Sequence, residues 1–179
     1  FFALAYSTAQ LLFSVGGFEI RPVQSTDIKN KFTFDQYFTS RMLNCIIMLI
    51  CMIGYIVVNG YTGVEALTVF WILGYRMVEA VADVYSGLFQ QRERIDISGK
   101  EMLMRSGIST ITFTIILWLT DNLLYAAMTL TLTSLVIMLF YDLHMKKYFE
   151  PTPVHLEWRG ILGIYNACWP LFVLSLIHI

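Results

Sequence analysis

One apolar stretch of the chain reads VEALTVFWILGYRMVEAVADVYSGLF, from Val64 to Phe89. At about 100° per residue, one side of a helix over this stretch carries three ionisable side chains: Arg76, Glu79 and Asp83. The same face continues with Ser86, Gly87 and Gln90. A charged side chain at bilayer depth costs roughly 2.5 to 3.5 kcal/mol on insertion scales, so it persists where it faces a partner helix or a wet cavity. This polar stripe is therefore the first place to look for function.

The composition is that of an integral membrane protein. Hydrophobic residues make up 57% of the chain and charged residues only 14%, whereas soluble domains carry roughly 25% charged residues. The mean hydropathy is +0.64. The formal net charge of −1 gives no indication of nucleic acid as a partner. The three cysteines lie in apolar runs without metal-ligand spacing, so we interpret them as packing residues.

Six stretches approach the length and apolarity needed to cross ~30 Å of hydrocarbon. The predicted spans are Phe1 to Phe18, Leu43 to Val58, Val64 to Phe89, Ser106 to Leu119, Leu123 to Tyr141 and Gly160 to Ile179. The sequence thus predicts an all-α, polytopic membrane helix bundle. Because the chain begins with Phe1 rather than Met and ends within an apolar run, we expect a fragment of a longer protein.

The connections between these spans alternate in charge. Three of them hold eleven of the twelve Lys and Arg residues: Glu19 to Met42, Gln91 to Arg105 and Asp142 to Arg159. The turns at 59–63 and 120–122 contain none. The positive-inside rule places the basic connections in the cytoplasm and leaves Arg76 as the only basic residue within the membrane. The segment from Phe32 to Arg41 is expected either to begin the second span early or to anchor at the interface.

The stripe suggests two chemical roles. The Arg76 guanidinium stays ionised and offers forked donors that match phosphate oxygens, so it is a candidate for binding a phosphate-bearing substrate. Glu79 and Asp83 are candidates for ion or proton coupling, since a carboxyl group removed from water can hold a proton. The alternative is that the three side chains only hold helices together. On the first span, Gln10 is the polar residue of most interest and a further candidate for binding the substrate.

The sequence contains no motif typical of an enzyme active site. His144, His155 and His178 are far apart, and no GxSxG, phosphate-binding loop or HExxH motif occurs. We therefore expect neither an enzyme nor a bound metal or cofactor.

Two stretches carry a resemblance to a known family. The first is RPVQSTD from Arg21 to Asp27, followed by Phe34, Tyr37 and Arg41. The second is RMVEAVADVYSGLFQQR from Arg76 to Arg92, followed by RID from Arg94 to Asp96. They resemble the Wzx-type polysaccharide flippases of the multidrug/oligosaccharidyl-lipid/polysaccharide exporter superfamily. The resemblance runs from about Phe1 to Leu174 and corresponds to spans two to seven of a longer protein.

The resemblance implies a transporter with two helical bundles that alternates between inward-open and outward-open states. It would move an undecaprenyl-pyrophosphate-linked oligosaccharide across the cytoplasmic (inner) membrane for surface polysaccharide synthesis. Residues 1–149 would form most of the N-terminal bundle, and residues 150–179 a cytoplasmic linker and the start of the C-terminal bundle. Membrane lipid, a polysaccharide polymerase and glycosyltransferases are the implied partners. The motif positions that carry over as substrate-binding candidates are Gln24, Asp27, Arg41, Arg76, Glu79, Asp83, Gln90 and Arg94.

Two other functions stay open from the sequence. A cation-coupled multidrug exporter of the same superfamily predicts a cavity dominated by acids and aromatic residues rather than by arginine. A membrane scaffold or assembly subunit predicts a stripe that binds a helix of another protein.

Overall fold

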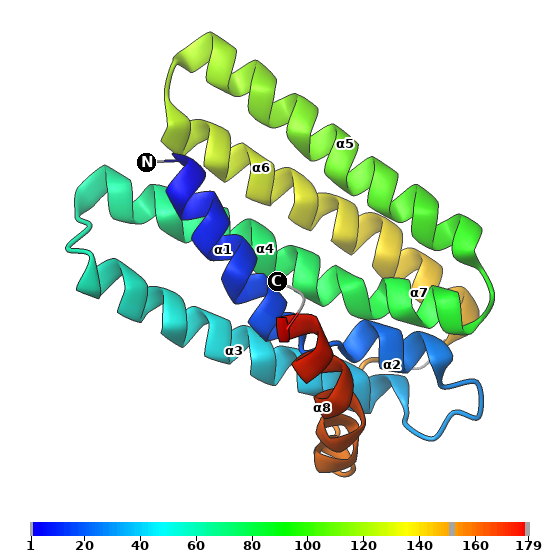
Figure 1. Cartoon of the computed structure of the whole chain (residues 1–179). Coiled ribbons are helices and arrows are strands. Elements are labelled where there is room, and N and C mark those ends of the chain that lie inside the picture. Colours follow the sequence, from blue (N-terminus) through cyan, green and yellow to red (C-terminus); the bar gives the residue numbers. More distant parts are fainter. Residues whose placement is uncertain (1, 151–152, 178–179) are drawn as a thin grey trace.

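The computed structural model describes residues 2–150 and 153–177, and its architecture is all-α (Figure 1). Seven continuous helices follow one another along these residues, because α6, a π-helical turn and α7 form one unbroken helix. The elements are α1 Phe2–Gly17, α2 Ile20–Thr26, α3 Phe34–Val58, α4 Gly63–Gln91, α5 Ile95–Thr120, α6 Leu123–Ile137, η1 Met138–Asp142, α7 Leu143–Phe149 and α8 Ile161–Ile177. Phe1, at the start of the first expected span, and His178 and Ile179, at the end of the last one, lie outside the described residues.

Three helices are long and apolar enough to cross a membrane. They are α3, α5 and the continuous helix Leu123–Phe149, with 25, 26 and 27 residues. At 1.5 Å per residue, each is long enough for the ~30 Å hydrocarbon core. Large apolar side chains stay exposed along them, among them Ile50, Ile111 and Trp118. These helices indicate a multi-pass membrane protein.

The other three expected spans also form helices close to their predicted bounds. Over the described residues, α1, α4 and α8 begin and end within two residues of those bounds. However, α1 has 16 residues and the apolar part of α8 is shorter than a usual span, which needs about 20. Helix α4 has 29 residues but carries the charged stripe. That these three helices also cross the membrane stays a prediction.

Two connections predicted to lie outside the spans are largely helical, which corrects the sequence analysis: α5 begins eleven residues before Ser106, and α7 extends eight residues beyond Tyr141. Helix α3 begins at Phe34, nine residues before Leu43, which agrees with the early start that was one of the two expectations for Phe32 to Arg41. A capping box begins α3: Thr33 Oγ1 accepts from the Gln36 amide at 3.3 Å, and Gln36 Oε1 accepts from the Thr33 amide at 3.1 Å. The predicted spans are too short at the start of α5 and beyond Tyr141 because polar side chains indicate solvent, whereas Glu101, Arg105 and Asp142 are buried in the structure.

The helices run back and forth, so that the connections rich in Lys and Arg lie at one end of the bundle and the two turns without Lys or Arg lie at the other. In Figure 1 the chain start, the α3–α4 turn and the α5–α6 turn lie at one end of the bundle. Residues at the start of α4 and in the α5–α6 turn line a common surface depression. Helix α2, the α4–α5 turn and the segment before α8 lie at the other end. The connections rich in Lys and Arg therefore share one end, as the alternation in the sequence predicts.

Close contact between α2 and α4 depends on Gly87. Gln24 of α2 is fully buried, and its Nε2 donates to the Val84 carbonyl oxygen at 3.1 Å. A Cβ atom at position 87 would lie 2.4 Å from Gln24 Oε1 and 2.8 Å from Gln24 Cδ. Gly87 thus leaves the space that the Gln24 side chain occupies.

We expect Gly87→Ala to lower stability by about 1 to 3 kcal/mol, because the added methyl group forces Gln24 and α2 away from α4. Gly107→Ala is the matched control, since a Cβ atom there meets nothing within 4 Å. In a helix interior the control change should be neutral or slightly stabilising. The midpoint of thermal unfolding in detergent measures both, and equal midpoints for the two variants would contradict this account of the α2–α4 contact.

Candidate functional site

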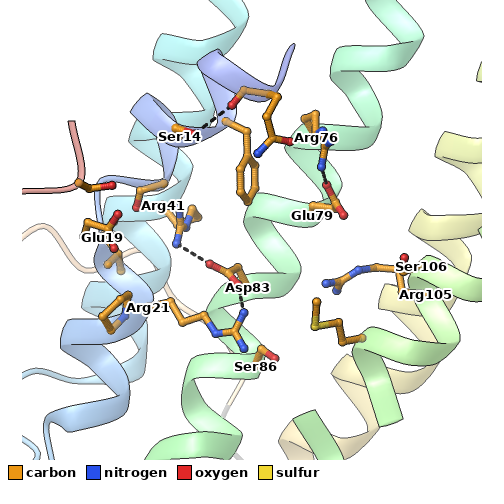
Figure 2. A pocket seen from close by; sticks show the side chains of 17 residues that line it. Ser14, Glu19, Arg21, Arg41, Arg76, Glu79, Asp83, Ser86, Arg105 and Ser106 are labelled. Carbon is orange, nitrogen blue, oxygen red and sulfur yellow. Dashed lines mark hydrogen bonds and ion pairs between the residues drawn. The ribbon is translucent and has the colours of Figure 1, made fainter. Parts of the chain in front are cut away.

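A cavity of about 450 Å³ lies among α1, α2, α3, α4 and α5, and α8 reaches it through Ser175 (Figure 2). Four arginines line it, each from a different helix: Arg21, Arg41, Arg76 and Arg105. Three carboxylates line it as well: Glu19, Glu79 and Asp83. The remaining polar lining residues are Gln10, Ser14, Ser86, Ser106 and Ser175. The polar stripe of α4 therefore faces a cavity rather than the outer surface of the bundle.

Asp83 joins two arginines from α2 and α3. Its Oδ1 accepts from Arg21 Nη1 at 2.8 Å, and its Oδ2 accepts from Arg41 Nη2 at 3.3 Å. Arg41 is fully buried and also donates to the carbonyl oxygens of Gly16 and Gly17, at 3.2 and 2.9 Å. These carbonyls lie at the carboxyl end of α1, where a cation is favourable. Two guanidinium groups face one carboxylate here, which leaves an excess positive charge.

Arg76 is held in a neutral pair within an aromatic enclosure. Its guanidinium pairs with Glu79 three residues along α4, and Tyr75 donates its hydroxyl to Glu79 at 3.0 Å. The guanidinium carbon lies 4.5 Å from the Tyr6 ring centroid and 5.8 Å from that of Phe13. Cation–π contacts of this kind favour the charged form and hold its orientation.

Arg105, on α5, approaches the cavity from the side opposite Arg21 and Arg41 (Figure 2). It pairs with Glu101 one turn earlier, and its Nη1 lies 3.7 Å from Asp142 Oδ2. Glu101 and Asp142 are both fully buried. Here one guanidinium faces two carboxylates, so the excess charge is negative when both acids are ionised.

The cavity brings together five of the nine predicted substrate-binding residues: Gln10, Arg41, Arg76, Glu79 and Asp83. The other four, Gln24, Asp27, Gln90 and Arg94, do not line it. Gln24 packs between α2 and α4, as described above. Asp27 shapes the turn before α3, because it accepts from the amides of Lys31 and Phe32 and from the Tyr37 hydroxyl.

Gln90 and Arg94 point elsewhere. Gln90 donates to Ser98 Oγ on α5 at 3.3 Å, so the expected stripe leaves the cavity after Ser86. Arg94 is exposed and forms a two-pronged pair with Asp96 at 2.8 and 2.9 Å.

Sequence reasoning missed Arg21, Arg105 and Glu19 as cavity residues, since all three were assigned to cytoplasmic connections. Arg76 is also not the only basic side chain withdrawn from the surface, because Arg41 and Arg105 are buried in helices. The spacing of Ser98, Glu101 and Arg105, three and then four residues apart, is the same as in the stripe of α4. That spacing was the available signal for a second polar helix face.

Comparisons with known proteins assign no family. No family model matches the chain, and no curated protein or solved structure matches it either. Within the described residues, no group of three or more His, Cys, Asp or Glu side chains is arranged to hold a metal ion.

Proposed function

We propose that this chain belongs to a membrane transporter that moves a phosphate-bearing, lipid-linked oligosaccharide across the cytoplasmic membrane. The observation that carries the proposal is the cavity with four arginines from four helices, which has an excess positive charge at Arg21, Arg41 and Asp83. Guanidinium groups bind phosphate oxygens through two parallel hydrogen bonds and remain charged in a cavity.

The cavity separates the parts of such a substrate by chemistry. Arg21 is partly exposed, with 30% of its side chain accessible, so it can turn from Asp83 toward an incoming phosphate group. Gln10, Ser14 and Ser106 offer neutral hydrogen-bonding groups to sugar hydroxyls. The polyprenyl chain would stay in the surrounding lipid. Arg76 stays a second candidate for the phosphate, although its pairing with Glu79 makes it the less available of the two.

In this proposal α1, α4 and α8 cross the membrane together with the three long apolar helices, and the basic connections face the cytoplasm. Residues 1–149 belong to one bundle of a two-bundle transporter, and α8 begins the second. Glu79 and Asp83 take part in ion coupling, and the cavity opens alternately to the two sides. Glycosyltransferases that make the substrate and a polymerase that uses it are the expected partners.

The rival functions make different demands on the cavity. A drug exporter of the same superfamily calls for acids and aromatic rings, whereas this cavity has more arginines than carboxylates in its lining. A scaffold calls for a surface that another helix can fill.

Deletion of the gene separates the three functions. A flippase predicts accumulated lipid-linked oligosaccharide and loss of surface glycan, whereas drug susceptibility with normal glycan would overturn the proposal. A tightly copurifying partner without accumulated intermediate would favour the scaffold.

Arg21→Gln is expected to reduce transport about tenfold or more, because it removes charge-assisted hydrogen bonds worth about 1.5 to 3 kcal/mol. Arg94→Gln is the control, since it makes the same change of charge at an exposed residue that does not line the cavity. Surface glycan and accumulated lipid-linked substrate are measured at equal protein abundance. An equal loss of transport in both variants would mean that transport depends on positive charge at the cytoplasmic end of the protein and not on the cavity.

A further inference from the structure

Two acidic residues beside the cavity have no role in the function proposed above. Glu101 of α5 and Asp142 of the π-helical turn are fully buried, and both approach the guanidinium of Arg105. Glu101 is well provided with partners, because its Oε2 accepts from the Ser86 hydroxyl at 2.9 Å. Among the described residues, neither carboxyl oxygen of Asp142 accepts a hydrogen bond.

The charges of this cluster do not balance if both acids are ionised. One guanidinium would then face two carboxylates in a region from which water is excluded, and an uncompensated buried charge costs several kcal/mol. The excess positive charge nearby does not reach Asp142, because it belongs to Arg21 and Arg41, which both contact Asp83. Arg21 and Asp83, the next charged groups to Glu101, are paired with each other, and the ring of Tyr85 is the group that α4 turns toward Asp142. Lys146, one turn along the same helix, lies 5.2 Å from the Phe34 ring centroid.

We infer that Glu101 and Asp142 bind one proton between them, with the proton on Asp142, and so form a proton-binding site behind Arg105. An ionised carboxylate has room for about four hydrogen bonds, and a buried one is normally provided with several of them. Asp142 has none among the described residues, whereas Glu101 has both Arg105 and Ser86. A proton suits the cluster better than a metal ion, because no third metal-ligating side chain joins the two acids in the described chain.

The backbone of the helix is adapted to this placement. Asp142 is the last residue of the π-helical turn Met138–Asp142, which interrupts the helix from Leu123 to Phe149. A π-helical turn holds an additional residue, so it rotates the side chains that follow it, and such turns are frequent at functional sites. At the end of this turn, the Asp142 carboxyl group is fully buried and lies next to Arg105.

The cluster is connected both to the cavity and to the basic end of the bundle. Arg105 and Ser86 line the cavity. On the other side, Ser86 Oγ contacts Ser98 Oγ, which accepts from Gln90 Nε2 at 3.3 Å. Gln90 is half-buried near the end of α4, so polar groups lead from Glu101 toward the end that carries the basic connections. If the protein is a transporter, as proposed above, protonation of this pair releases Arg105 from one of its acids and so changes the charge that faces the substrate.

Infrared difference spectroscopy of the purified full-length protein tests the site without any transport assay. The carbonyl stretch of a buried protonated carboxyl group should be present at neutral pH and disappear at alkaline pH. Asp142→Asn and Glu101→Gln should each abolish it, because either change leaves one acid for one guanidinium. Arg105→Gln should strengthen it, since both acids must then be neutral. Asp96→Asn, at an exposed ion pair, is the control and should leave the band unchanged.

Two results would overturn the inference. One is the absence of the band from the unmodified protein at neutral pH, a measurement that does not depend on any variant being folded. The other is a band that persists in both Asp142→Asn and Glu101→Gln. The proton site and the proposed function can fail separately: a band that behaves as expected, in a protein whose gene deletion leaves lipid-linked oligosaccharide unaffected, retains the site and rejects the flippase.

Discussion

Asp83→Asn is expected to lower the stability of the protein by about 3 to 5 kcal/mol, the range found when one partner of a buried ion pair is removed. The physical reason is Arg41, whose side chain is fully buried and whose only carboxylate partner in the described chain is Asp83. Asparagine keeps the shape of the side chain but leaves two guanidinium groups without a counter-charge. The thermal midpoint of the purified protein and its abundance in the membrane are the two measurements.

A surface aspartate supplies the matched control. Asp96 accepts two hydrogen bonds from Arg94, but both side chains are about half exposed, at 50% and 51%. Because solvent screens exposed ion pairs and they contribute little to stability, Asp96→Asn should hardly change the midpoint. The double variant with Arg41→Gln and Asp83→Asn should be more stable than the sum of the two single losses implies. Strict additivity would show that the two side chains act independently.

The sequence was sufficient to predict the helices that carry the stripe and the direction in which it faces. In α4 the apolar residues and the spacing of Arg76, Glu79 and Asp83 are both local properties of one helix. Their shared face follows from helical geometry alone. The cavity side of that face follows from the cost of placing charge against lipid.

The partners of the stripe could not be predicted in the same way. Arg21 and Asp83 are separated by 62 residues, and their contact depends on how α2 docks onto α4 beside Gly87. Nothing in the local sequence around Arg21 distinguishes a residue of a cytoplasmic loop from one that points into a cavity. The positive-inside rule counts a basic residue without regard to its pairing, so it gives no sign that Arg105 is buried, and only the resemblance points to Arg41 as a cavity residue.

The three arginine clusters have different excess charges, which suggests a division of roles. The Asp83 cluster has one positive charge in excess, the Arg76 pair is neutral, and the Arg105 cluster has one negative charge in excess before any proton binds. Glu19 also lines the cavity, but it forms no ion pair among the described residues. The positive cluster is the site best suited to an anionic substrate, and the negative cluster is the one suited to a proton.

Arg105→Gln is the second change for which we expect a large effect, again about 3 to 5 kcal/mol of stability. Arg105 is the only basic residue paired with either Glu101 or Asp142 in the described chain, and neither acid is accessible to solvent. Its loss leaves two buried acids to be neutralised by protons alone. Arg94→Gln is the control, since the same substitution just before α5 removes an exposed ion pair that contributes little to stability.

Removal of one acid should compensate for the loss of the arginine. In the double variant with Arg105→Gln and Glu101→Gln, Asp142 is the single remaining acid of the cluster and can stay neutral with one proton. Its thermal midpoint should therefore lie above that of Arg105→Gln alone, even though a second native residue has been replaced. Ser86 and Ser98 would still bond each other, so the contact between α4 and α5 retains its polar core. A double variant less stable than Arg105→Gln would show that Glu101 stabilises the fold through Ser86 rather than through its charge.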